Sequence, residues 1–248
     1  MERIVINNLS KKFKIGSKRK TALDNLLSLF FNRDSKVIQV LNDISFTAND
    51  GENIGIIGAN GSGKSTLLMI LAGIYKKNSG KIKINGKTLF LSIMNNGIMP
   101  NLTMRDNIFL SGSILGLGQK DIKKKFNKIV EFSGLEEFVD TKVSKFSTGM
   151  NLRLAFSITI HCVSHAKPDI LFLDEIFGSG GDLDFQKKAK GKMEQLVSGG
   201  ATVLLVSHSL DLIKQVCDKV IWLEKGKIKM IGKPKEVCDR YVKSFEKG

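Results

Sequence analysis

Residues 58–65 read Gly-Ala-Asn-Gly-Ser-Gly-Lys-Ser, between a short apolar segment, Asn53 to Ile57, and a helical pattern that continues to Leu71. The spacing fits the phosphate-loop pattern GxxxxGK[ST], and a strand before the loop with a helix after it is the context this pattern requires. Glycines let a backbone wrap closely around phosphates, and a helix N-terminus directs N–H groups toward them. The segment therefore predicts a nucleotide-binding α/β fold.

Individual positions of this loop are candidate ligands for a nucleoside triphosphate and its metal. Lys64 is placed to bridge the β and γ phosphates, and the Ser65 hydroxyl to take a Mg²⁺ position. The expected phosphate contacts are Gly58, Ala59, Asn60, Gly61, Ser62, Gly63, Lys64, Ser65 and Thr66.

Two acidic residues follow a second apolar segment. Ile170 to Leu173 has the continuous apolar character of a buried parallel strand, and Asp174 and Glu175 come directly after it. Open α/β sheets bind ligands at the carboxyl ends of such strands. We expect Asp174 to hold Mg²⁺, directly or through water, and Glu175 to orient or deprotonate the attacking water. His208 follows another strand pattern, Thr202 to Val206, and is expected to point at the same γ-phosphate.

Composition excludes several other classes of protein. The 248 residues are 42% hydrophobic and 25% charged, a globular balance, and the three cysteines form no CxxC pair, which disfavours a disulfide scaffold or zinc knuckle. No apolar run reaches the roughly 18 to 20 residues that span a bilayer, and the N-terminus carries charges where a signal peptide has its apolar core. The net charge of +15 permits an acidic partner, but scattered lysines and few aromatics favour a solvated surface.

The remaining pattern predicts strands interrupted by a helical insertion. Further strands are expected at residues 3–6, 37–46, 81–84, 88–92, 220–223 and 227–230, with Asn85-Gly86 as a hairpin turn. Residues 97–163 are expected to form an all-helical subdomain inserted into a core of residues 1–96 and 164–248. Thr21 to Phe31 predicts a short amphipathic helix that either packs on its own domain or docks a partner.

One more motif completes a recognisable order. Phe146-Ser147-Thr148-Gly149-Met150 precedes a helical pattern from Asn151, so Ser147 can cap that helix and its free N–H groups can bind an anion. Along the chain the order is the phosphate loop, then this motif, then Asp-Glu and then His. This order resembles that of the ATP-binding-cassette (ABC) family. The usual signature there begins LSGGQ, so Thr148 and Met150 depart from it. The FSTGM form is similar to that of the branch exporting capsule, O-antigen or teichoic-acid chains.

Two further stretches are similar to that branch, and the resemblance covers roughly residues 3–240. Residues 178–186, GSGGDLDFQ, resemble its GD-containing dimer loop with one residue more than usual, and Asp182 is the matching aspartate. Pro100 to Thr103 and Arg105 to Ile108 also resemble it.

The resemblance implies a RecA-like core with an antiparallel β subdomain and an inserted helical subdomain. It implies a homodimer that sandwiches two ATP molecules head to tail, each site combining one chain's phosphate loop with the other's Ser147 and Gly149. Hydrolysis of MgATP would drive a polytopic membrane permease from the cytoplasmic face of the inner membrane, with the polysaccharide handled through the permease. No nucleic-acid partner is expected.

Some family features are missing or leave alternatives open. The Gln that usually follows residues 88–92 is absent, and only Asn95 or Asn96 offers an amide. Gln39 stands where an adenine-stacking aromatic is usual, and Phe13, or Phe30 with Phe31, is the candidate substitute; use of GTP stays open. About 40 residues follow His208, too few for the C-terminal carbohydrate-binding domain of some relatives, so none is expected. Competing hypotheses are export of a drug, lipid or peptide, a soluble ABC ATPase acting on DNA or ribosomes, and a phosphate-loop kinase or GTPase.

Overall fold

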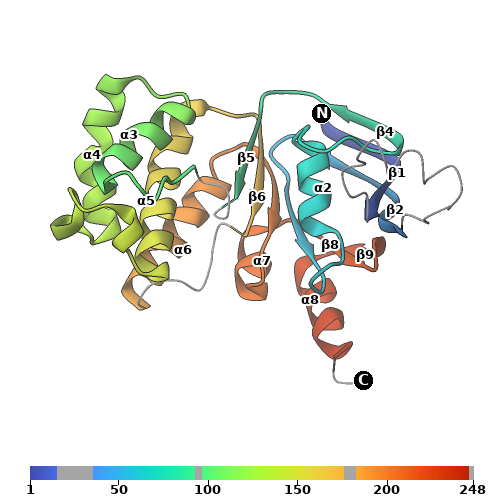
Figure 1. The fold of residues 1–248 in the computed structure, drawn as a ribbon. Coiled ribbons are helices and arrows are strands. Elements are labelled where there is room, and N and C mark those ends of the chain that lie inside the picture. Colours follow the sequence, from blue (N-terminus) through green and yellow to red (C-terminus); the bar gives the residue numbers. More distant parts are fainter. Residues whose placement is uncertain (16–35, 93–96, 176–182, 246–248) are drawn as a thin grey trace, which may run out of the picture.

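Two sheets of different kinds build the molecule, and helices cover them (Figure 1). The computed structural model describes residues 1–15, 36–92, 97–175 and 183–245. The smaller sheet is three-stranded and antiparallel, in the order β2-β1-β4. Its strands are β1 (Glu2–Ile15), β2 (Lys36–Asn49) and β4 (Ser79–Ile84).

The larger sheet carries the residues of interest. Its order is β5-β6-β7-β3-β8-β9, parallel except for the antiparallel pair β8 and β9. The strands are β3 (Asn53–Ile57), β5 (Thr88–Ser92), β6 (Ile170–Asp174), β7 (Thr202–Val206), β8 (Lys219–Glu224) and β9 (Lys227–Gly232). β3 lies between β7 and β8, so the strand that leads into the phosphate loop is central.

The two faces of this sheet pack into separate cores. On β6, Ile170 and Phe172 pack with α2 (Lys64–Leu71) and the antiparallel sheet. Leu171 and Leu173 face the opposite core, which includes residues of α6, α7 and α8. Every residue of β6 and β7 is buried, which explains why both read as unbroken apolar runs. The covering helices are α6 (Leu183–Val197), α7 (Leu210–Val216) and α8 (Pro234–Lys243).

The helical segment lies between β5 and β6 and has its own core. Met104, Ile108, Ile122 and Leu154 belong to that core and are fully buried. Its helices are α3 (Met104–Ile114), α4 (Gln119–Ser133) and α5 (Thr148–Ala166), with short 3-10 turns at Glu136–Phe138 and Val143–Lys145. α5 continues beyond residue 163, so the last helix of the insertion crosses the boundary that the sequence suggested. Among the described residues, no helix has the length and apolar character to cross a bilayer.

The expected hairpin at Asn85-Gly86 is wrong. β4 pairs with β1 in the antiparallel sheet, whereas β5 pairs with β6 in the other sheet. The Asn85 amide donates a hydrogen bond to Glu2 O at 2.9 Å, so this turn carries the chain between sheets. The Asn-Gly signal reports a local change of direction and holds no information about which strands then pair.

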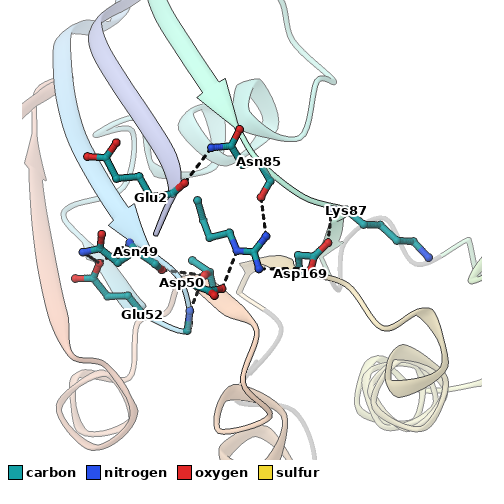
Figure 2. A network of polar contacts seen from close by, with 10 residues as sticks. Glu2, Asn49, Asp50, Glu52, Asn85, Lys87 and Asp169 are labelled. Carbon is teal, nitrogen blue, oxygen red and sulfur yellow. Dashed lines mark hydrogen bonds and ion pairs between the residues drawn. The ribbon is translucent and has the colours of Figure 1, made fainter.

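Arg3 ties the two sheets together at this crossing. Figure 2 shows its partners Asp50, Asn85 and Asp169. Its Nε lies 2.7 Å from Asp50 Oδ1, its Nη1 donates to Asn85 O at 3.1 Å, and its Nη2 lies 3.7 Å from Asp169 Oδ1. Asp169 immediately precedes β6 and also accepts the backbone N–H of Lys87 at 2.7 Å. The Arg3 hydrogen bond holds the pKa of Asp50 below its ordinary value.

Candidate nucleotide-binding site

The phosphate loop is shaped by glycines at its two ends. Gly58 has φ +151°, and a Cβ there would lie 2.2 Å from Leu223 O. Gly63 has φ +105°, and a Cβ there would lie 2.6 Å from the side chain of Leu41 and 2.9 Å from Val40 O. Any larger residue at either position would displace the loop. The Ser62 hydroxyl is buried and, within the described residues, has no hydrogen-bond partner, as suits a loop built around a further polar group.

The ammonium group of Lys64 lies inside this loop. Lys64 is only 6% exposed, and its Nζ donates to Gly58 O at 2.8 Å and to Ala59 O at 3.1 Å. Burial lowers the pKa of Lys64, and the charges of Glu175 and Asp174 oppose that shift. A buried cation beside the first turn of α2 is placed to neutralise phosphate.

Ser65 and Asp174 meet although they lie on α2 and at the end of β6. The Ser65 hydroxyl donates to Asp174 Oδ1 at 3.1 Å, and Asp174 is 5% exposed. Burial raises the pKa of Asp174, and the charge of Glu175 raises it further, whereas the Ser65 hydrogen bond and the charge of Lys64 lower it. One hydroxyl and one carboxylate are a donor set that fits Mg²⁺, which completes its coordination with waters and phosphate oxygens. No group of three His, Cys, Asp or Glu that could hold a metal occurs in the part of the chain described.

Glu175 and His208 form a second pair at the carboxyl ends of β6 and β7. Nε2 of His208 lies 2.9 Å from Oε1 of Glu175, and both side chains reach solvent. Glu175 has φ +50°, a left-handed conformation that is uncommon for a residue with a Cβ. Its backbone N–H donates to Val206 O at 3.0 Å, which fixes it to the neighbouring strand. Such strained residues cluster at functional sites.

The structure adds three supporting residues to those that the sequence motifs indicate: Ser207, Ser209 and Gly226. Ser207 Oγ accepts the N–H of Ser209 at 3.1 Å, and Ser209 caps α7 through the N–H of Leu212 at 3.3 Å, so hydroxyls hold both flanks of His208. Gly226, in the turn between β8 and β9, donates its N–H to Ser62 O at 3.1 Å. The Ser-x-Ser spacing around His208 is a turn signal that was readable. The contact of Gly226 depends on tertiary structure.

Ser147 and Gly149 lie at the start of α5, the last helix of the inserted segment. Ser147 is the N-cap of α5, and its Oγ accepts the N–H of Met150 at 3.2 Å, as the sequence predicted. Ser147 and Thr148 are exposed and Gly149 is half-buried. In the described part of the chain, the hydrogen bonds of Ser147 stay within the start of α5, so this chain alone does not join Ser147 to its own phosphate loop.

Phe13 is the only candidate adenine contact that lies among the described residues. Its ring packs edge-on against Tyr75 with centroids 5.5 Å apart, and Lys11 Nζ lies 4.6 Å from its centre. Asp182, Asn95, Asn96 and the Thr21 to Phe31 segment lie outside the described residues, so their expected roles stay predictions.

Comparison with known proteins identifies this arrangement. Residues 41–178 match the family model described as ABC transporter. The O-antigen export system ATP-binding protein RfbB of Klebsiella pneumoniae is 36% identical over 83% of this chain and 81% of its own length. The chain belongs to the ABC transporter family. It is an ABC-type ATPase, and the cassette spans the phosphate loop, Asp174 and Glu175.

Other similarities agree with this assignment. The teichoic acids export ATP-binding protein TagH of Lactococcus lactis is 40% identical over 95% of the cassette, which spans about half (49%) of that relative. A solved dimeric ATP-binding cassette, MJ0796 in a post-hydrolysis state with ADP and Pi, superposes with a TM-score of 0.70. It covers 93% of this chain and 98% of its own at 20% identity, which supports the fold. The predicted cassette fold and the predicted family are confirmed.

Proposed function

We propose that this cassette hydrolyses MgATP to drive export of a cell-surface polysaccharide, on a lipid carrier, through a membrane-spanning partner. The assignment of a polysaccharide as the exported substrate rests on the similarity to proteins named for O-antigen and teichoic acid export. The cassette would lie on the cytoplasmic face of the membrane as a peripheral subunit bound to a permease. Export of a drug, lipid or peptide is the alternative that the same ATPase would serve.

The geometry supports distinct roles for the clustered side chains. Lys64 would neutralise the β and γ phosphates, and Ser65 with Asp174 would hold Mg²⁺, which supplies charge neutralisation when bound. Glu175 would accept the proton of the attacking water, and its hydrogen-bond distance to His208 supports a joint alignment of that water and the γ-phosphate. Glu175 directly follows β6 in a left-handed conformation, and its carboxylate lies beside His208.

Two chains would complete each site. Among the described residues, the exposed N-terminus of α5 makes no hydrogen bond to its own phosphate loop, so a second copy would supply Ser147 and Gly149 to the γ-phosphate. Asp182 would lie in the contact between the two copies. Bound ATP would then hold the two chains together. Its hydrolysis would release this contact between the chains and change the state of the permease.

Affinity purification tests this proposal. Tagged Glu175→Gln protein would be expressed in its native cell, and membranes would be solubilised with MgATP present. We expect a polytopic membrane protein with bound lipid-linked sugar to co-purify. A permease without glycan would leave transport standing and reject the polysaccharide. Ribosomes or DNA without any membrane protein would reject transport itself.

A further inference from the structure

A basic groove runs along α4, α5 and α6 at the helical end of the molecule, where Figure 1 shows these helices side by side. It consists of two adjoining cavities of about 880 and 440 Å³. They share four lining residues: Lys128, His161, Lys192 and Gln195. Volumes in this range are typical of sites for small molecules.

The groove lies at the opposite edge of the sheet from the nucleotide site. Pro168 and Asp169, which precede β6, line it, as does Ala201, which precedes β7. Asp174 and His208 belong to the carboxyl ends of those same parallel strands. A strand of five residues separates the two edges by about 16 Å. A ligand in the groove would therefore be distinct from the hydrolysed nucleotide.

Lysines dominate the lining of the groove, and most have no anionic partner in the part of the chain that the structure describes. They are Lys124, Lys125, Lys128, Lys167, Lys187, Lys188 and Lys192. Among the residues described, only Lys124 of this set has a carboxylate within ion-pair distance, Asp121 at 3.7 Å. Two of the lining carboxylates, Asp50 and Asp169, contact Arg3 instead, which leaves Glu131. The groove thus carries a large excess of positive charge.

These charges converge on the floor of the groove at His161. Burial lowers the pKa of His161, and the charges of Lys192, Lys125 and Lys128 lower it further, while its hydrogen bond to Ser157 O opposes the shift. The charges of lysines on both α4 and α6 therefore act on one histidine of α5. Positive potential focused in a recess attracts an anion more strongly than the same charges on a convex surface.

Gly191 is a second, independent feature of the groove. It lies within α6, where glycine is an unfavourable helix residue, and a Cβ there would have nothing within 4 Å. Helical spacing places it beside Lys187, Lys188 and Gln195, which line the same cavity. Packing thus does not require glycine here, and its effect is to leave open space between lysines.

We propose that this groove binds a small soluble organic compound that carries two or more phosphate groups. Lysine binds phosphate as a mobile point charge, which suits several phosphates better than one planar carboxylate. Phe132, which is half-buried, adds apolar surface for the carbon skeleton. The lining lysines come from α4, from α6 and from the segment before β6, so one compact compound between these elements can contact several of them at once.

Inositol hexakisphosphate is a suitable probe. Its binding would be measured by titration calorimetry on Glu175→Gln protein that is saturated with MgATP, so that the phosphate loop is already occupied. We expect binding that weakens with salt. Lys128→Glu combined with Lys192→Glu should weaken it at least tenfold. Lys81→Glu combined with Lys83→Glu, two exposed positions on β4, changes net charge equally and should leave affinity within twofold.

A glycine variant provides a test that net charge does not affect. Gly191→Leu should lower affinity for the probe at least tenfold, without lowering the melting temperature, because leucine favours the helix and fills only the open space. Three results would overturn the proposal. The first is an equal loss of affinity for the probe in both double variants, and the second is unchanged affinity in Gly191→Leu. The third is binding to anionic phospholipid vesicles without binding to the probe. MgATP affinity, measured in parallel, tests the nucleotide site separately.

Discussion

Nε2 of His208 and Oε1 of Glu175 are 2.9 Å apart across the ends of β7 and β6. Both residues reach solvent beside the buried Asp174 and Lys64. The exposed pair is thus accessible to water, while the buried pair is placed for phosphate and metal.

Glu175→Gln should lower ATP turnover by about 10² to 10⁴-fold, because the amide cannot accept the proton of the attacking water. ATP affinity should stay within a few-fold, and the ATP-bound dimer should accumulate. Turnover assays and light scattering with MgATP measure both. Glu136→Gln, at an exposed site in the helical segment, is the matched control. Turnover at the parent rate would remove Glu175 from the catalytic role.

Glu175→Gly should stabilise the protein by about 1 kcal/mol relative to Glu175→Ala, because glycine adopts φ +50° without the strain of a Cβ. Both variants lose the carboxylate, so their difference isolates the backbone. Urea denaturation measures it through the transition midpoint. Equal midpoints would show that the backbone at this position is unstrained.

Ser147→Arg should reduce turnover more than tenfold while the monomer still binds ATP, because the bulky cation would block the contact made by a second chain. Ser144→Arg is the control, since Ser144 is also exposed and close in sequence. Nucleotide binding to the monomer and turnover are measured separately. If Ser147→Arg hydrolyses ATP normally, the head-to-tail arrangement is wrong.

Asp174→Asn should stabilise the nucleotide-free protein at neutral pH and abolish Mg²⁺-dependent turnover. The folded pKa of Asp174 is raised, so its buried charge costs stability above the folded pKa, and this cost disappears as the pH falls toward 3.8. The stability gain of the variant should therefore shrink as the pH falls below neutral. Thermal melting at several pH values measures this. A gain independent of pH would contradict it.

Arg3→Gln should lower the melting temperature at neutral pH, because three partners from different parts of the chain lose their shared cation. Arg3 lowers the pKa of Asp50, so its contribution is complete above 3.8 and is lost as the pH falls through the folded pKa. The difference between the two proteins should narrow in acid. Combining Arg3→Gln with Asp50→Asn tests this, since the double variant should lose less than the sum of the single variants.

Sequence patterns located the strands and the site because both depend on local rules. Asn53–Ile57 and Thr202–Val206 form with the predicted bounds, since a buried parallel strand has a continuous apolar signature. Thr88–Ser92 also has the predicted bounds, although it was expected as one arm of the Asn85-Gly86 hairpin that does not form. The phosphate-loop pattern likewise predicts its own local geometry, because Gly58 and Gly63, the two glycines that the pattern requires, both adopt positive φ between β3 and α2.

The features that the sequence did not predict depend on tertiary structure. The sequence around Asn85-Gly86 is that of a tight turn, and only the pairing partners of β4 and β5 reveal a crossing between sheets. β1 is far longer than expected, because its polar second half pairs with β2 and needs no apolar alternation to do so. Glu175 has a left-handed backbone and donates its N–H to Val206 on the neighbouring strand, a contact that the local sequence does not reveal.

The central position of β3 determines when the phosphate loop can form during synthesis. Both neighbours of β3 come from the last third of the chain, and the N–H of Asn53 is held by a carboxylate 165 residues later. A ribosome adds about 5 to 20 residues per second, so β3 waits on the order of ten seconds or longer for its partners. A truncated chain has the whole nucleotide motif and no sheet to support it. Nucleotide would therefore stabilise only completed molecules, and interrupted ones would remain open to proteases.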